Sequence, residues 1–155
     1  MTWGVVVWLH VVAAMTWVGG MIFISLILAP SLRKLPAGQR WELLRTVGTA
    51  TRVAGWISLL ILLSTGLLNV LHLQIQWNSL TGRLLIVKLS LVAAVLALSA
   101  LHDFVLGPAL VARQQGSAPA EPSAARMRRL VPWLARMNLL LALGIVYLAV
   151  LIARS

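Results

Sequence analysis

The stretch WGVVVWLHVVAAMTWVGGMIFISLILA, residues 3–29, is the strongest indication of the fold. It is longer than the roughly 20 apolar residues that a membrane-spanning helix needs, and His10 is its only ionisable residue. It is too long, and too poor in preceding basic residues, for a cleaved secretory signal, so we expect it to stay in the mature protein. The sequence therefore predicts one all-α domain, an integral membrane up-down-up-down four-helix bundle. Its spans are expected at about residues 3–29, 52–73, 82–106 and 132–153, within a domain covering 1–155.

The composition is typical of an integral membrane protein. Hydrophobic residues make up 61% of the 155 residues and the mean hydropathy is +0.96, which is more than a soluble domain of this size can bury. Cysteine is absent, which excludes disulfides, thiolate metal sites and cysteine nucleophiles. The chemistry that remains possible at a functional site is that of imidazole, thioether, carboxylate and porphyrin groups. The signatures of soluble enzymes, such as a phosphate-cradling glycine loop or a zinc-protease helix, are missing from the sequence.

The basic residues indicate orientation and not nucleic-acid binding. The formal net charge is +10, but the bases stand at the ends of apolar runs and no groove-reading motif accompanies them. By the positive-inside tendency, we expect both basic loops in the cytoplasm and both termini outside a plasma (inner) membrane. The bases on the cytoplasmic side are Arg33, Lys34, Arg40, Arg45, Arg52, Arg113, Arg126, Arg128, Arg129 and Arg136, and those on the outer side are Arg83 and Arg154.

Two histidines on different spans fall in the same outer half of the membrane. His10 lies near the start of the first span, and His72 lies near the end of the second. Imidazoles at similar depth on two helices are what bis-histidine ligation of a b-type haem requires. The same pair can hold a copper ion, with Met1 or Met15 as a thioether ligand. The alternatives are a single ligand, a proton relay, or a structural role in which each ring hydrogen-bonds a neighbouring helix.

Further residues are expected around this histidine pair. Lys88 carries an ammonium inside the third span, where it must snorkel to the surface or find an anion, and the outer half holds no acidic residue. A porphyrin carboxylate would supply that anion. Trp17 follows His10 by seven residues, so it shares nearly the same face and can either wall a planar ligand or pack in the core. The full set of cofactor-binding candidates is His10, His72, Lys88, Arg83, Asn69 and Trp17.

A second polar layer is expected toward the cytoplasm. His102 and Asp103 lie near the inner end of the third span, and Arg136 and Asn138 lie early in the fourth. An ion pair of Asp103 with Arg136, with Asn138 bonding between helices, would satisfy these groups. Alternatively, His102 adds a second metal or haem site, or passes protons. Adjacent helical residues point about 100° apart, so His102 and Asp103 are not expected to face one ligand.

Several short motifs resemble those of a known family. They are Trp8 to His10, Met15 to Met21 and Ala29 to Arg33, then Thr65-Gly66, and finally Arg128 to Leu130 with Met137 to Leu140. In these the chain resembles the CopD copper-resistance family over most of its length, which implies copper handling in uptake or resistance. Through His10, Trp17 and Lys88 it resembles, more distantly, the HemJ family of protoporphyrinogen oxidases, which implies porphyrin or haem binding.

These observations predict one function and two alternatives. The first is a CopD-like membrane protein that binds copper or a redox cofactor through His10 and His72 and acts in copper homeostasis or transport. The second is a haem-dependent membrane oxidoreductase with a quinone as electron acceptor, in which Lys88 and Arg83 neutralise the propionates. The third is a structural accessory subunit of a larger membrane complex. Small residues that permit close helix packing, and with it a homodimer, are Gly19, Gly20, Gly55, Gly66 and Gly144.

Overall fold

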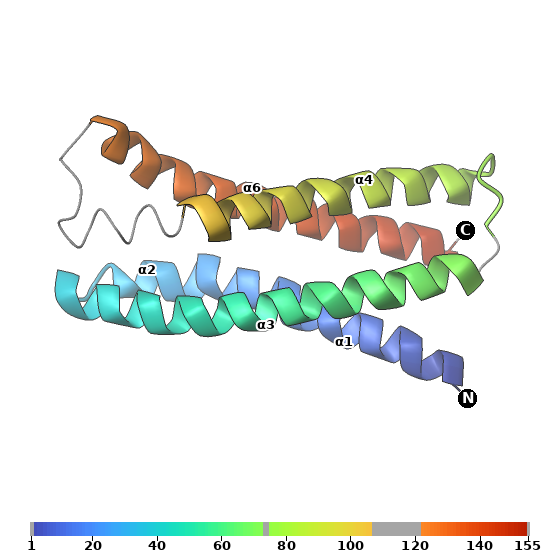
Figure 1. Ribbon diagram of the computed structural model, residues 1–155, viewed down its shortest axis with the longest axis horizontal. Coiled ribbons are helices and arrows are strands. Elements are labelled where there is room, and N and C mark those ends of the chain that lie inside the picture. Colours follow the sequence, from blue (N-terminus) through green and yellow to red (C-terminus); the bar gives the residue numbers. More distant parts are fainter. Residues whose placement is uncertain (1, 73–74, 107–121, 155) are drawn as a thin grey trace. The chain divides into compact units, whose positions relative to one another are not determined.

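The computed structural model describes residues 2–72, 75–106 and 122–154 (Figure 1). Within these ranges the chain is helical and contains no strand. Four helical stretches are long and apolar enough to cross a bilayer, which confirms the all-α, four-span prediction. They are Trp3–Leu32, Gly38–His72, Leu80–Leu106 and Trp133–Arg154.

The first span is built from three consecutive helical segments. These are α1 (Thr2–Ile22), the π-helical η1 (Phe23–Leu28) and α2 (Ala29–Leu32). Pro30 has no N–H to give to the preceding turn, and just before it the helix widens, so that the Ala29 N–H bonds to the Ile24 carbonyl five residues back. The span therefore continues past Pro30, where the sequence predicted its end.

The second span, α3 (Ala37–His72), is longer than predicted. Its 36 residues extend about 54 Å, well beyond the roughly 30 Å hydrocarbon core of a bilayer. Arg40 and Arg45, expected in a loop, lie within its first turns. Leu, Glu, Gln and Arg in this region are good helix formers, and Thr49 donates its hydroxyl hydrogen to the Arg45 carbonyl at 2.8 Å. Hydropathy does not detect these first turns of α3, because their residues are polar.

The second half of the chain contains α4 (Leu80–Ala100), the π-helical η2 (Leu101–Leu106) and α6 (Pro122–Arg154). Ser79 caps α4, and its hydroxyl oxygen accepts a hydrogen bond from the Gly82 N–H at 3.1 Å. Pro122 suits the first position of α6, where an N–H would have no helical partner. Residues 114–123 are rich in Gln, Gly, Ser, Ala and Pro, which is typical of a flexible connector, and most of them lie outside the described residues.

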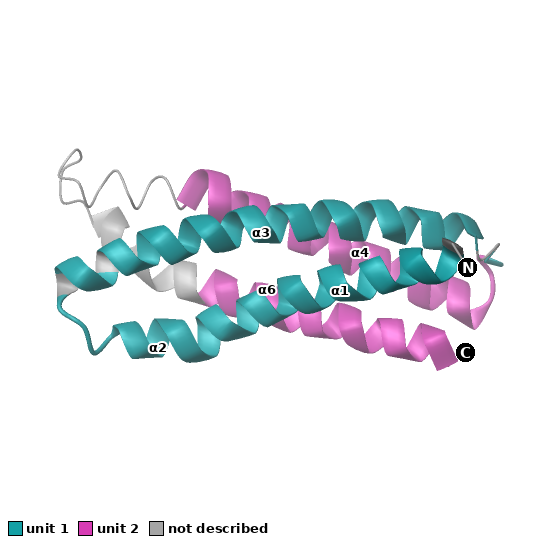
Figure 2. Ribbon diagram, turned by 90° about the horizontal axis from the view of Figure 1, so that it is seen from below, with its two compact units in different colours: residues 1–76 teal, residues 77–155 magenta. Residues whose placement is uncertain are grey.

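The chain divides into two compact units, residues 1–76 and 77–155, shown in Figure 2. In the first unit α1 packs antiparallel to α3, and in the second α4 packs against α6. The prediction of a single domain stays a prediction. Large apolar side chains are exposed on every one of these four helices, as lipid contact requires. Examples are Trp8, Leu60, Ile86 and Leu140.

Candidate functional site

A seam of polar and aromatic residues joins α1 to α3 in the first unit. Its members recur every seven residues, a period that keeps side chains on one face and is typical of left-handed helix pairs. The contacts run in antiparallel order, with Trp3 against His72 at one end of the seam and His10 against Thr65 two turns further along α1. The seam comprises Trp3, His10 and Trp17 on α1, and Thr51, Ser58, Thr65 and His72 on α3.

The His10 ring is held in one protonation pattern by Thr65. The Nδ1 atom of His10 lies 2.7 Å from the Thr65 hydroxyl oxygen, and that hydroxyl lies 2.6 Å from the carbonyl of Ile61. A hydroxyl has one hydrogen, and Thr65 gives it to the main chain, so its oxygen must accept from His10. Nδ1 of His10 is therefore the protonated nitrogen, and Nε2 carries the lone pair of the neutral ring.

Glycine makes room for the rings of this seam. A Cβ on Gly66 would stand 3.5 Å from Cε1 of His10, and one on Gly55 would stand 3.8 Å from Cδ1 of Trp17. Both glycines therefore lie directly under a ring, as the predicted close approach of helices requires. At Gly19, in contrast, a Cβ would meet nothing within 4 Å among the described residues. Trp17 thus packs on α3 beside Gly55, and its predicted role as the wall of a ligand site stays a prediction.

His72 lies at the end of the seam nearest the start of α1, in an aromatic stack. Its ring centroid is 3.8 Å from that of Trp3, with an interplanar angle of 22°. The His72 side chain is exposed, whereas His10 is only partly exposed. Such a stack contributes about 0.5–1.5 kcal/mol beyond the burial of its area. The Trp3 contact holds the His72 imidazole at the last turn of α3.

The structure does not bring His10 and His72 to one level. Each ring contacts a residue of the opposite helix at its own level, and the two levels are seven residues apart on both helices. Seven residues correspond to about 10 Å along the axis, whereas two imidazole nitrogens on one metal ion lie about 4 Å apart. These two rings therefore do not fit a shared copper ion or the two faces of a haem. The sequence argument placed both in the outer half but missed the offset of two turns.

The other residues predicted around the histidine pair are divided between the two units. Asn69 lies on α3, one turn before His72, and is half-buried. Lys88 and Arg83 lie on α4 in the second unit, with Lys88 half-buried and Arg83 exposed. Their convergence with the histidines stays a prediction. Over the described ranges, no group of three or more His, Asp or Glu side chains could hold a metal ion.

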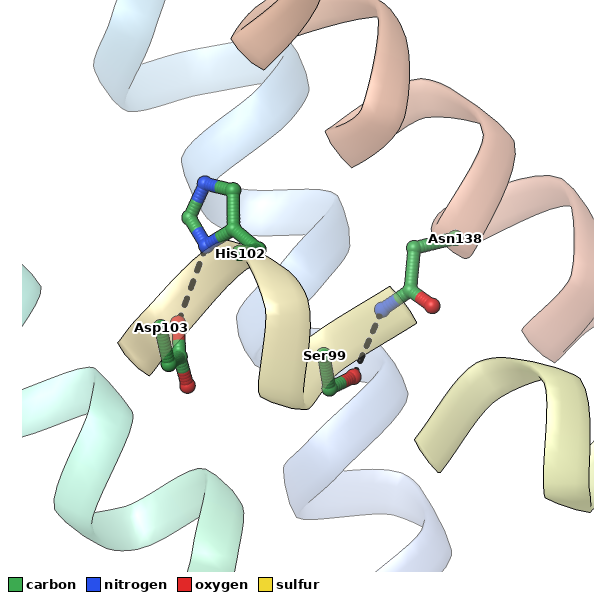
Figure 3. A network of polar contacts seen from close by, with 4 residues as sticks. All are labelled: Ser99, His102, Asp103 and Asn138. Carbon is green, nitrogen blue, oxygen red and sulfur yellow. Dashed lines mark hydrogen bonds and ion pairs between the residues drawn. The ribbon is translucent and has the colours of Figure 1, made fainter. Parts of the chain in front are cut away.

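The second polar layer expected from the sequence lies at the end of α4, in η2 and on the facing part of α6 (Figure 3). Nδ1 of His102 lies 2.9 Å from Oδ1 of Asp103, so the two adjacent side chains contact each other. The expectation that they do not face one ligand stays a prediction. The Asn138 amide donates to the Ser99 hydroxyl at 3.1 Å, the bond between helices expected of Asn138. The predicted Asp103–Arg136 ion pair stays a prediction, and Arg136 is exposed.

Two contact residues of these sites, Trp3 and Ser99, were not singled out from the sequence, and Thr65 was named only as part of a family motif. Trp3 and Thr65 could have been found by counting residues along the two spans, because residues at equal distance from the shared end of two antiparallel helices lie beside each other. The sevenfold spacing from Thr51 to His72 marks the same face of α3. Ser99 carries no comparable signal beyond its place one turn before His102.

Comparison with known proteins gives one family and one relative. Residues 52–152 match the family described as Copper resistance protein D, CopD. An uncharacterized protein of Aquifex aeolicus (strain VF5) is 34% identical over 143 residues, which cover 92% of this chain and 89% of that protein. No solved structure matches. The resemblance to CopD is thereby confirmed, whereas the more distant HemJ resemblance is not shown.

Proposed function

Because the chain belongs to the CopD family, we propose that it is a multi-pass membrane protein that handles copper ions and takes them at the Nε2 atom of His10. Copper is the cargo in this proposal and not a resident cofactor. The observation that carries it is the hydrogen bond from Nδ1 of His10 to Thr65. Family membership supports copper as the metal, and the geometry of His10 supports Nε2 as the atom that binds it.

The chemistry of the His10 ring suits copper. Imidazole is a good ligand for copper, and a metal binds a ring nitrogen that carries a lone pair. Histidines that bind metals usually donate their other N–H to an oxygen, which fixes the tautomer and the ring orientation. Thr65 supplies that oxygen here, and because it is only 7% exposed, water cannot easily replace it. The ring is thus oriented by the protein in advance.

The charge of the surroundings favours the monovalent ion. His10, Thr65 and Trp17 are neutral, and the described acidic residue of the first unit, Glu42, lies near the opposite end of α3. A divalent ion among neutral groups at membrane depth would be costly, and that cost falls with the charge of the ion. We therefore assign Cu⁺ as the ion taken at His10.

The exposed His72 is the outer contact in this proposal. Its ring stands about 10 Å nearer the outer end than His10, along the same seam. An ion that arrives from the outer side would meet His72 first and His10 second, each through one imidazole. This direction rests on the distribution of basic residues, which favours termini outside the cytoplasm.

Copper binding to the full chain in lipid nanodiscs tests the proposal. His10→Ala should remove Cu⁺ binding at this level, Thr65→Val should weaken it, and Thr65→Ser should leave it nearly unchanged because the hydroxyl is retained. Cells that carry the deletion or His10→Ala should show altered copper tolerance. Full Cu⁺ binding in the His10→Ala variant would contradict the proposal.

The same purified protein also tests the haem alternative. A colourless sample that binds Cu⁺ is the expected result. A Soret band with sharp bands after reduction by dithionite would instead assign a b-type haem and replace copper handling by redox chemistry.

A further inference from the structure

The two helices of the first unit differ in character at the end where α2 leads into α3 (Figure 1). The pairs Trp3–His72 and His10–Thr65 fix an antiparallel register, in which residues equally far from the shared end of α1 and α3 lie at one level. Continued along both helices, this register places η1 and α2 at the level of about residues 43–52 of α3. The first span is still apolar at that level, whereas α3 carries arginines and threonines.

The first span has more apolar length than the core of a bilayer takes up. Trp3–Leu32 contains 30 residues, about 45 Å of helix, against a hydrocarbon core about 30 Å thick. The surplus lies in η1, where Phe23, Leu26 and Ile27 are 47%, 66% and 54% exposed. Exposed side chains of this size are stable among acyl chains and costly in water.

On α3 the same level carries cations. Arg45 and Arg52 are both exposed, and because they are seven residues apart they project from one face, about 10 Å apart along the axis. Three more bases lie around the turn between the helices: Arg33, Lys34 and Arg40. Glu42 is the one acidic residue in the sequence of this unit, and over residues 2–72, as far as the structure describes them, no base forms an ion pair with it. The positive charge of this end is therefore not neutralised by the described part of the unit.

Apolar and cationic side chains at one level match one kind of partner. We propose that residues 23–52 form a binding surface for anionic phospholipids, in which the side chains of η1 enter the acyl chains and Arg45 and Arg52 bind phosphate groups. A guanidinium fits a phosphate through paired hydrogen bonds, and basic segments beside a membrane are attracted to anionic lipid. A nucleic acid or a soluble acidic protein would leave η1 uncovered. The surface does not involve His10, so this proposal and copper handling stand or fall separately.

A moderate tilt of the first unit accommodates both kinds of side chain. Ile27 lies 24 residues beyond Trp3, about 36 Å along the helix, and Arg45 lies 27 residues before His72, about 41 Å. Tilted by about 35°, within the range of roughly 0–40° for membrane helices, these lengths cover about 30 Å and about 33 Å of depth. Ile27 then reaches the edge of the core and Arg45 lies among the phosphate groups. Arg52 extends to the same layer, because side chains lean toward the N-terminus of their helix and a long basic side chain can snorkel.

Spin labels that report depth in the bilayer test this arrangement on the full chain. The sequence has no cysteine, so one labelling site can be introduced at a time. Gly48→Cys suits the basic side of α3, since a Cβ there would meet nothing within 4 Å among the described residues, and Leu26→Cys suits η1. In nanodiscs of phosphatidylglycerol, we expect the label at position 26 among the acyl chains and the label at position 48 at the headgroups. In phosphatidylcholine, the label at position 48 should be more accessible to a water-soluble nickel chelate. Equal accessibility of position 48 in the two lipids would overturn the proposal.

Removal of charge tests the role of the two arginines. Each base near an anionic surface strengthens binding about fivefold, so the double variant Arg45→Gln with Arg52→Gln should bind phosphatidylglycerol about 25-fold more weakly, as measured by native mass spectrometry. Arg45→Lys with Arg52→Lys is the matched control and should retain most of the affinity, because the charge is kept. Unchanged affinity in the glutamine variant, or an equal loss in both variants, would refute phosphate binding by these arginines. Displacement of the lipid by inorganic phosphate alone would assign them to a soluble anion and overturn the lipid surface.

Discussion

Replacing Thr65 by valine removes one hydroxyl oxygen from the centre of the α1–α3 seam and keeps the shape of the side chain. The lost contact is the 2.7 Å bond from Nδ1 of His10, and Thr65 is 7% exposed, so water has poor access to the vacated position. Hydrogen bonds between membrane helices average about 0.6 kcal/mol and reach about 1.7 kcal/mol. We expect a loss toward the upper end, about 1–2 kcal/mol in the free energy of unfolding, because a partly buried N–H is left without an acceptor.

Thr65→Val should affect Cu⁺ affinity more than it affects the free energy of unfolding. Without Thr65 the neutral His10 ring can also carry its proton on Nε2, the atom assigned to the ion, and we expect Cu⁺ affinity to fall about 10–100-fold. Reversible unfolding in mixed micelles, followed by tryptophan fluorescence, measures the first quantity, and competition with a Cu⁺ chelator measures the second. Thr65→Ser retains the hydroxyl and is the matched control. If Thr65→Val and Thr65→Ser bind Cu⁺ equally well, Thr65 does not orient the ring.

Three further predictions concern packing, capping and stacking. Gly66→Ala should fold with near-native stability, because its Cβ would stand 3.5 Å from Cε1 of His10. Gly66→Leu should displace the His10 ring and reduce both the melting temperature and Cu⁺ binding. Equal melting temperatures for the two variants would contradict the contact between Gly66 and His10. Ser79→Ala should lower the free energy of unfolding by about 1 kcal/mol through loss of the α4 cap, whereas Ser79→Asp should retain the cap. Hydrogen exchange of the Gly82 amide measures this change. Unaltered exchange in Ser79→Ala would argue against the cap. His72→Ala should remove about 0.5–1.5 kcal/mol of aromatic stacking with Trp3, measured against His72→Phe; identical unfolding curves for these two would mean that the stack adds nothing.

The sequence was sufficient to predict the four spans, because apolar length and the scarcity of charge are properties of the chain alone. The added length of α3 before residue 52 and of α6 before residue 132 was missed, because those turns are polar and hydropathy does not distinguish a polar helix from a loop.

The register between helices was harder to predict than their limits. His10 and His72 both fall in the outer half, but an offset of two turns decides whether two rings can bind one ion. Thr65, which decides the tautomer of His10, was noted in the sequence only as part of the Thr65-Gly66 motif, and its contact with the ring depends on this register. The contact of His102 with Asp103 lies in a π-helical turn, and no such turn was expected from the sequence.

Histidine-selective nitrogen-15 magnetic resonance measures copper binding at His10 most directly, since the chain has three histidines and each ring nitrogen reports its own protonation. Before copper is added, the signals of His10 should show a protonated Nδ1 and an unprotonated Nε2. On addition of Cu⁺, the Nε2 signal of His10 should shift while Nδ1 keeps its proton. A His10 ring protonated at Nε2, or one whose signals do not change with saturating Cu⁺, would contradict copper binding at this histidine.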